Sequence, residues 1–232
     1  MEQGFDLSYM VEVIPKLMKA FPLTIKLAFI SLAFGFLLGL VLVIFRLRKG
    51  KVLRGLAGAY IRVIRSTPTI VLLFLLFYGL PVLLSLVGLD ISGWDKVSFG
   101  IICYTMFSGA YFSETMRAAY ESVPKGQYEA GVSVGLSEFQ ALARIVIPQA
   151  FAVALPNFGN TIIQILKDTS VIFTLGVVDL LGQAKLISTN GYGIKKIEVF
   201  IAVSLIYWVI SLVIEKLSDF LEKHYTKNRA AT

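Results

Sequence analysis

Charged residues, cysteine and histidine are scarce in this sequence, and each shortage excludes a class of protein. Of 232 residues only 16% are charged and 56% are hydrophobic, a balance too apolar for an ordinary soluble domain. The single cysteine, Cys103, has no intrachain partner, and the single histidine, His224, stands alone in a polar stretch. We therefore expect no disulfide framework and no metal site.

Two further features are absent from the sequence. No G-x-x-x-x-G-K-[ST] stretch occurs, so the chain lacks the phosphate loop with which many ATPases hold ATP. The first 20 residues carry Glu2, Asp6 and Glu12 and contain no compact apolar core, so we expect no cleavable signal peptide. Catalytic residues and a cofactor bound to this chain are likewise not expected, and the protein is predicted not to be an enzyme.

Long apolar runs are what the sequence does have. A bilayer core is about 30 Å thick and needs about 20 apolar residues per spanning helix. The segments that meet or nearly meet this length are Phe21–Phe45, Ile61–Gly88, Val97–Ala119, Ile147–Leu166 and Val199–Ile214. The apolar stretch Val171–Leu181 is too short to span and is expected to be a broken element beside the fourth helix. The predicted fold class is an all-α membrane protein with about five transmembrane helices.

Lysine and arginine in the short connections predict the orientation. Residues 46–54, "RLRKGKVLR", hold five positive charges and no acid, so this connection is expected in the cytoplasm. Counting through five spans places the N-terminus outside and residues 215–232 inside as a cytoplasmic tail. Apolar residues at helical spacing predict an external helix on the membrane surface within residues 1–20. The net charge of +7 mostly reflects this asymmetry, so nucleic acid is not an expected partner.

A short polar segment separates the third and fourth predicted spans. Pro124 cannot continue the preceding helix, and a new helix is predicted from about Lys125 to Val134. Gly135 suits the left-handed conformation that ends a helix, and Ser137 with Gln140 forms a capping-box pattern that starts the next one. We expect Phe139, Leu142, Ile145 and Val146 to face the fourth span. A stiff helix of about ten residues held between two spans is well suited to transmit force from a docked partner.

This segment, "EAGVSVGLSEFQALARIVIPQA", resembles the EAA loop of ABC-transporter permease subunits. The residues that match the pattern are Glu129, Ala130, Gly135, Ile145 and Pro148, whereas Gly131 replaces an alanine and Ile147 a leucine. Three other stretches resemble the polar amino-acid uptake branch, which includes histidine, glutamine and cystine permeases: "RSTPTIVLLFLLFYGLP" (65–81), "GAYFSETMRAAYESVPKGQ" (109–127) and "LKDTS" (166–170). In that branch glycine stands where this chain has Ser66, and glutamine often stands where it has Leu72.

The resemblance implies a type I ABC importer permease fold, with residues 1–232 forming a single permease domain. It implies that residues 125–136 form a cytoplasmic coupling helix in which Glu129, Ala130, Gly131 and Gly135, with Pro148 beyond it, serve docking to a separate dimeric ATPase that binds ATP and magnesium. It further implies a second permease copy, identical or homologous, an extracellular solute-binding protein, and an amino-acid substrate. The expected location is the inner membrane of a bacterial cell, among its lipids.

Polar residues within the spans are candidates for the substrate pathway, because charges in a membrane face the protein interior or water. Glu114 is expected either to pair with Arg117 one turn on or to act as a gate at the inner mouth. Lys167 and Asp168 either cap helix ends or match the charges of a zwitterion at a broken helix. The remaining candidates are Asn160, Gln164, Thr169 and Ser170.

Two alternatives fit the hydropathy equally well. A secondary transporter would be driven by an ion gradient, although no second half of the kind found in many carriers is detectable in the chain. A channel would need a filter-like pore loop, and the sequence contains no glycine-rich one. The Gly35-x-x-x-Gly39 spacing is expected to serve close helix packing.

Overall fold

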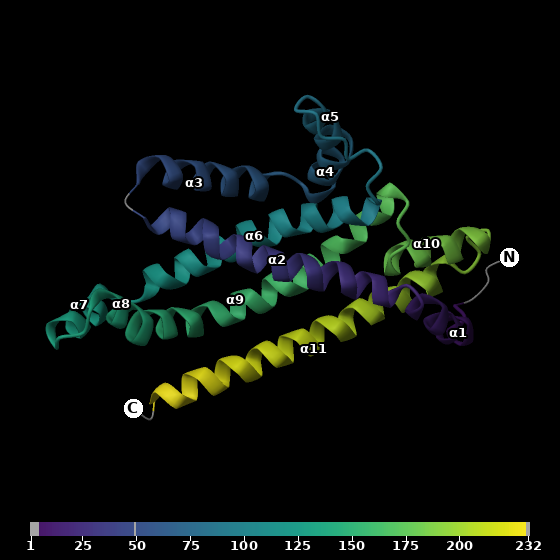
Figure 1. Cartoon of the computed structure of the whole chain (residues 1–232). Helices are drawn as coiled ribbons and strands as arrows, with labels where there is room; N and C mark the ends of the chain where they lie inside the picture. The colour runs from purple at the N-terminus through teal and green to yellow at the C-terminus, as the bar shows by residue number, and fades with distance from the viewer. Residues whose placement is uncertain (1–4, 49, 231–232) are drawn as a thin grey trace. The chain divides into compact units, whose positions relative to one another are not determined.

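The computed structural model describes residues 5–48 and 50–230, with side chains described as far as Tyr225. Within these ranges the chain is all-helical and contains no β-strand, as predicted. Figure 1 shows the elements in chain order. They are α1 (Leu7–Met18), α2 (Phe21–Leu47), α3 (Lys51–Ser66), α4 (Thr69–Phe74), the π-helical η1 (Leu75–Gly79), α5 (Leu80–Ser85), α6 (Lys96–Ser122), α7 (Lys125–Ser133), α8 (Glu138–Ala141), the π-helical η2 (Leu142–Val146), α9 (Ile147–Asp168), the 3₁₀-helical η3 (Thr169–Leu175), α10 (Leu180–Asn190) and α11 (Lys196–Ala230).

Three helical stretches in the described ranges are long and apolar enough to cross a membrane: α2, the continuous run Glu138–Leu175, and Lys196–Tyr225. They contain the first, fourth and fifth predicted spans. The second prediction, a continuous helix over Ile61–Gly88, is wrong. Pro68 has extended backbone and its ring disfavours a helical residue before it, so α3 ends and α4 begins there. The two pieces are long and apolar enough to cross a membrane only when taken together as one span, bent by 110°.

The third predicted span lies within α6, a helix of 27 residues. At about 1.5 Å per residue it is long enough to cross a bilayer. Its serines, glycines and charged residues make its most apolar stretch less apolar than those of α2, Glu138–Leu175 and Lys196–Tyr225. Three or four spans are therefore supported, and the number five stays a prediction.

The chain divides into two compact units, each described here by itself. Unit 1 contains the residues up to Ala33, Thr67–Thr105 and Ile163–Val213, and unit 2 contains Phe34–Ser66, Met106–Ile162 and the residues from Ile214 onward. The long helices α2, α6, α9 and α11 contribute residues to both units. The expectation of a single permease domain stays a prediction.

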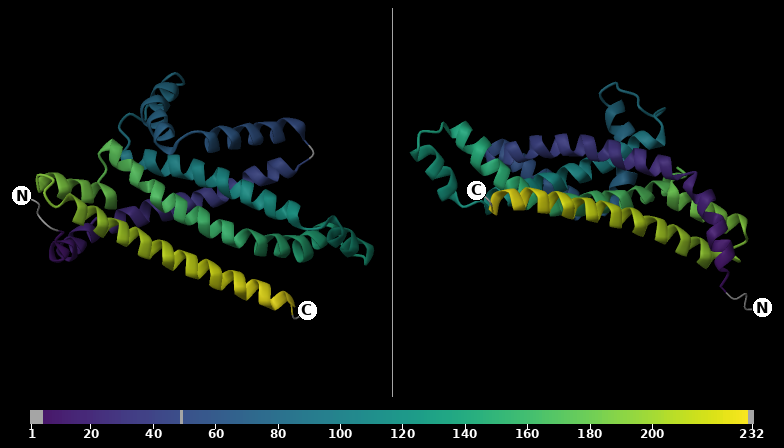
Figure 2. Two further views of the ribbon diagram at one scale, coloured as in Figure 1. Left: turned by 180° about the vertical axis from the view of Figure 1, so that it is seen from behind. Right: turned by 90° about the horizontal axis from the view of Figure 1, so that it is seen from below.

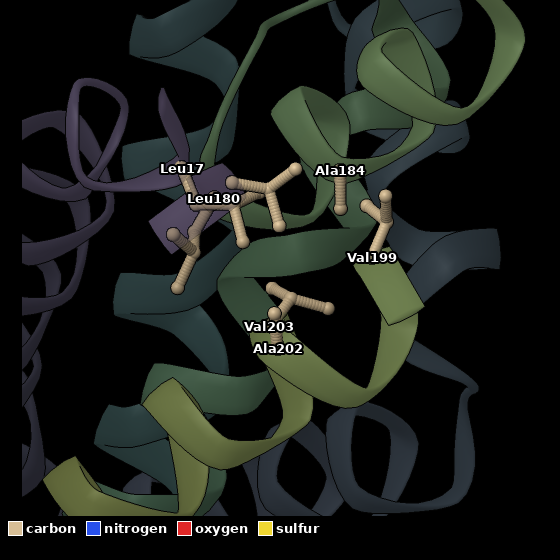
Figure 3. Close-up of a cluster of buried hydrophobic side chains, with 7 residues drawn as sticks. Leu17, Leu180, Ala184, Val199, Ala202 and Val203 are labelled. Atoms are coloured by element: carbon tan, nitrogen blue, oxygen red, sulfur yellow. The ribbon is translucent and has the colours of Figure 1, made fainter. Parts of the chain in front are cut away.

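Unit 1 is held together where α1 packs against α10 and the start of α11 (Figure 2). The buried side chains of this cluster are Val13, Leu17, Leu180, Ala184, Val199, Ala202 and Val203 (Figure 3). Val13 and Leu17 lie one helical turn apart, so they present one apolar face of α1, while Leu7 and Val11 are exposed. The predicted amphipathic helix within residues 1–20 is thus present.

Polar contacts fasten the N-terminus of α1 to the start of α11. An oxygen of the Asp6 carboxylate accepts a hydrogen bond from the backbone N–H of Tyr9 at 3.0 Å, and the other pairs with Lys195 Nζ at 3.0 Å. The Asp6 N–H donates to the buried carboxylate of Glu198 at 3.1 Å. The Tyr9 hydrogen bond, followed by Lys195, holds the pKa of Asp6 below its ordinary 3.8, so this tether persists at neutral pH and weakens as the pH falls below that value.

Unit 2 depends on small residues where α2 meets α6. A Cβ atom added at Gly35 would lie 1.8 Å from Ser108 Oγ and 2.8 Å from Ser108 Cβ, and one added at Gly39 would lie 2.9 Å from Phe112 Cβ. The predicted role of this glycine pair in close helix packing is therefore confirmed. Beside it the rings of Phe36, Phe112 and Phe158 meet edge to face, with centroids 5.5 to 6.1 Å apart.

We expect Gly35→Ala to lower the stability of the chain by about 1–3 kcal/mol, because overpacking a tight contact forces backbone shifts. Gly55→Ala is the matched control, since Gly55 is also helical but nothing lies within 4 Å of its added Cβ. Thermal unfolding in detergent should show a lower midpoint for the first variant only. Equal midpoints for the two variants would contradict the packing assigned to Gly35.

Residues 215–230 continue α11 as a helix. Within unit 2 this part packs on α9: a Cβ added at Gly159 would lie 2.2 Å from Ser218 Oγ, and the rings of Phe151 and Tyr225 are 5.4 Å apart. The predicted tail is thus an ordered extension of α11 as far as the structure describes it, and its cytoplasmic location stays a prediction.

Candidate functional site

The segment between α6 and α9 folds as the residues at its helix boundaries predict. Pro124 has extended backbone and precedes α7. At the other end Gly135 has φ +90°, its N–H donates to Val132 O at 3.0 Å, and the next N–H, of Leu136, donates to Gly131 O at 3.1 Å. This pair of bonds is a Schellman motif, which satisfies carbonyls left free at a helix end. The left-handed conformation explains why glycine occupies position 135.

The capping box that follows is also confirmed. The Gln140 N–H donates to Ser137 Oγ at 3.2 Å, and the Ser137 N–H donates to Gln140 Oε1 at 2.9 Å. α8 is only four residues long and continues through η2 into α9. Pro148, in the first turn of α9, is exposed and has no N–H, which fits the irregular bonding of η2 immediately before it.

The predicted coupling residues divide into inward and outward sets. Gly131 is buried, and a Cβ added there would lie 2.7 Å from Ile145 Cδ1 and 3.2 Å from Ala141 Cβ, so this glycine lets α7 lie against α8 and η2 (Figure 2). Glu129 and Ala130 are exposed on α7. Gly131 therefore serves internal packing, and only the exposed residues offer a surface to a partner.

Two exposed apolar residues extend this outward surface. Val134 is 79% exposed and Phe139 is 77% exposed, although Phe139 was expected to face the fourth span. That expectation is wrong because η2 is π-helical, which shifts the helical phase between Phe139 and the buried Val146. Large exposed apolar side chains next to charged ones are typical of interaction surfaces. Val132, on α7, is 40% exposed and lies between Ala130 and Val134 in sequence. We name Glu129, Ala130, Val132, Val134 and Phe139 the coupling surface.

Ion pairs gather at Glu114 in unit 2. Arg46 Nη1 lies 2.6 Å from Glu114 Oε2, and Arg117 pairs with both Glu114 and Glu121. The predicted pair of Glu114 with Arg117 is confirmed, whereas Arg46 was missed because it lies 68 residues away in sequence. The Glu114 carboxylate is thus shared by two guanidinium groups, and the one from Arg46 joins α2 to α6.

The end of α9 carries a second polar cluster, in unit 1. The Asp168 carboxylate accepts hydrogen bonds from Gln164 Nε2 at 3.2 Å and from Thr69 Oγ1 at 3.3 Å. Gln164 was among the pathway candidates, and its role there stays a prediction, whereas Thr69 was missed. The Asp168 side chain makes no capping bond to η3, so the predicted cap is wrong: the carboxylate is occupied by these two donors instead.

The residues after Asp168 are fixed by tyrosines. Thr169 is buried, and its carbonyl accepts a hydrogen bond from the Tyr104 hydroxyl at 3.2 Å. Ser170 Oγ lies 2.8 Å from the Tyr207 hydroxyl, which also lies 3.5 Å from the carboxylate of the buried Asp179. Asp179 is the N-cap of α10, and its carboxylate accepts a hydrogen bond from the Gly182 N–H. An aspartate at the start of a predicted helix, three residues before that N–H, was the sequence signal that could have identified it.

Two pathway candidates stand apart from this cluster. Lys167 is exposed in the last turn of α9 and forms no ion pair within 4 Å in the described part of the chain. Asn160 is exposed and belongs to unit 2, whereas Asp168 belongs to unit 1, so the two are described separately and the role of Asn160 stays a prediction. The cluster consists of Thr69, Gln164, Asp168, Thr169 and Ser170, and we name it the α9 break.

Residues 12–227 match the family described as the binding-protein-dependent transport system inner membrane component. The chain belongs to this family of permeases. The resemblance to ABC-transporter permease subunits, seen first in the EAA-type loop, is thereby confirmed.

Curated relatives resemble this permease along nearly its whole length. It is 39% identical to the L-cystine transport system permease protein TcyL of Bacillus subtilis, over 99% of this chain and 95% of that protein. It is also 39% identical to the nopaline transport system permease protein NocM of Agrobacterium fabrum, over 91% of this chain and 88% of that protein.

Solved structures confirm the fold of the permease. A chain from the crystal structure of an amino acid ABC transporter with histidines is 32% identical and has a TM-score of 0.83, covering 96% of this chain and all of that one. A chain from an inward facing MetNI methionine ABC transporter is 20% identical with a TM-score of 0.72, a likeness of fold alone. The predicted type I ABC importer permease fold is thus confirmed.

Proposed function

We propose that this permease forms the membrane pathway of an ATP-driven amino-acid importer and is coupled through α7 to a separate ATPase. The observation that carries the proposal is the exposed coupling surface on α7 and α8, which the Schellman motif, the capping box and the buried Gly131 hold against one another. Family membership and the names of its relatives support the transport of an amino acid or a close derivative.

The coupling step follows from the rigidity of α7. At about 1.5 Å per residue its nine residues extend about 13 Å, too short to cross a membrane. The Schellman motif, the capping box and the buried Gly131 fix it against α8 and η2. Movement of a partner bound to Glu129, Val134 and Phe139 would therefore be passed to α6 and α9, which α7 joins. Alternating access is the result proposed for such movement.

The α9 break is the proposed substrate contact. Asp168 has no cationic partner within the described residues, and its carboxylate lies where α9 changes to a 3₁₀ helix. An unpaired carboxylate within a membrane protein matches the ammonium group of an amino acid, and the neighbouring Lys167 matches its carboxylate. Glu114 is proposed as a gate residue, whose pairs with Arg46 and Arg117 would break and re-form as the inner mouth opens.

The proposed assembly contains an ATPase dimer that binds ATP and magnesium, a second permease copy and an extracellular solute-binding protein. In it the N-terminus lies outside and the coupling surface lies in the cytoplasm of a bacterial cell. The basic connection that includes Arg46 and Arg54 supports this orientation.

Site-directed cross-linking tests the proposal. Cys103 is buried, so a cysteine introduced at exposed Ala130 or Val134 is the reactive thiol of choice. In membranes that contain the assembled transporter, we expect both positions to cross-link to the ATPase. The buried Ala141→Cys variant is the control and should not react. No ATPase cross-link at either exposed position would contradict coupling through α7.

A further inference from the structure

Helix α3 carries its positive charges along one side. Lys51, Arg54, Arg62 and Arg65 lie 3, 8 and 3 residues apart, so at about 100° per residue they fall within an arc of about 80°. All four side chains belong to exposed residues. We name this row the cationic stripe.

The other faces of α3 are apolar. Ala57, Ile61 and Ile64 are buried in unit 2. Val52 and Leu56, on a third face, are 75% and 64% exposed. Exposed aliphatic side chains on a helix of a membrane protein suit contact with acyl chains, as on amphipathic helices at a membrane surface.

The C-terminal half of the cationic stripe lines a pocket of about 400 Å³ in unit 2. Its polar lining comes from α2, α3 and α6, and consists of Arg46, Arg62, Arg65, Ser66, Tyr111 and Glu114. The Arg65 guanidinium lies over the ring of Tyr111, 5.3 Å from its centroid, which holds this side chain in place.

The charges of this pocket do not balance. Its one carboxylate, Glu114, is already shared by Arg46 and Arg117. Arg62 and Arg65 have no carboxylate within 4 Å in the described ranges. Two neighbouring guanidinium groups repel each other unless an anion lies between them, and their planar forks match phosphate oxygens.

We propose that this pocket binds the phosphate of an anionic phospholipid. The guanidinium groups of Arg62 and Arg65 donate to the phosphate oxygens, and the hydroxyls of Ser66 and Tyr111 are further donors beside them. Basic pockets between membrane helices bind anionic headgroups in this way. A lipid is the occupant because the same helix presents exposed aliphatic residues to acyl chains. The bound headgroup would fasten α3 to α2 and α6.

Native mass spectrometry of the full-length chain in detergent tests this assignment, with phosphatidylglycerol and phosphatidylcholine as probes. We expect phosphatidylglycerol to be retained at least about tenfold better than phosphatidylcholine. The double variant R62Q/R65Q should lose most of this preference, since each cation near the headgroup contributes about 1 kcal/mol, or roughly fivefold in affinity.

The control K51Q/R54Q removes the same charge from the same stripe outside the pocket, and its preference should change less than about twofold. Equal losses in the two double variants would overturn the pocket and leave only diffuse attraction between cations and anionic lipids. Retention of both lipids to the same extent by the unaltered chain would also overturn the proposal.

Two additions separate a lipid from other occupants and from misfolding. Excess inorganic phosphate should leave phosphatidylglycerol bound, and full displacement by phosphate would show that the pocket takes the free ion instead. The R62K/R65K variant keeps both charges and should retain part of the preference. If R62Q/R65Q aggregates, R62K/R65K still tests the proposal. Loss of all preference for phosphatidylglycerol in a well-folded R62K/R65K chain would contradict binding through charge.

Discussion

Gly135→Val is expected to abolish ATP-driven uptake while the chain still inserts in the membrane. Position 135 has φ +90°, where a β-branched residue is strained, and its N–H belongs to the Schellman motif that ends α7. Relief of this strain requires α7 to unwind at its end, which moves Val134 and Leu136. We expect transport to fall by more than about tenfold, equivalent to about 1.4 kcal/mol in coupling, and co-purification of the ATPase to be lost.

Gly126→Val is the matched control for this variant. Gly126 lies in the first turn of the same helix, has ordinary backbone, and nothing lies within 4 Å of its added Cβ. Co-purification and uptake should remain near normal for it. A Gly135→Val chain that binds the ATPase and transports normally would show that the fixed end of α7 is not needed for coupling.

Asp168→Ala is the second variant with a large expected effect. It removes the carboxylate that Gln164 and Thr69 hold in unit 1, and with it the proposed contact for a substrate ammonium group. A hydrogen bond to a charged group contributes about 1.5–3 kcal/mol, so uptake should fall roughly 10- to 100-fold. ATPase co-purification should be unchanged, because the coupling surface belongs to unit 2.

Lys167→Gln and Gln164→Ala distinguish the loss of a charge that binds substrate from the loss of a hydrogen bond to Asp168. If the zwitterion is matched by both charges, Lys167→Gln should also reduce uptake, although Lys167 has no ion pair of its own to lose. Gln164→Ala removes one hydrogen bond to Asp168 and leaves the charge, so a smaller loss is expected. Normal uptake by Asp168→Ala, with normal protein levels, would exclude the α9 break as the substrate contact.

The ends of helices were predictable from the sequence because the hydrogen bonds that form them span only a few residues. Gly135 and the pair Ser137 and Gln140 determine where α7 ends and α8 begins through bonds spanning at most five residues. The four straight apolar runs gave four long helices for the same reason: length and hydrophobicity are local properties.

Contacts between distant segments were not predictable in this way. Arg46 reaches Glu114 across 68 residues, and Thr69 reaches Asp168 across 99. No spacing rule joins such positions. The break at Pro68 was overlooked since the segment was judged by its overall hydropathy, which does not register the lost backbone donor.

The orientation of single side chains was the third limit. Phe139 was expected to face the fourth span together with Val146, but the π-helical η2 between them interrupts the regular helical phase. Gly131, conversely, was expected to contact a partner protein, but the space beside it is occupied by the Ile145 side chain of the same chain. Both errors concern which face a residue occupies, and they moved the coupling surface towards Val134 and Phe139.

Reconstitution in proteoliposomes tests the central claim most directly. The permease would be incorporated with its ATPase, supplied with a solute-binding protein outside and ATP inside, and uptake of labelled amino acids measured. The account predicts uptake that requires all three components and stops when ATP is withheld. Equal uptake by the permease alone, driven by an ion gradient, would contradict it.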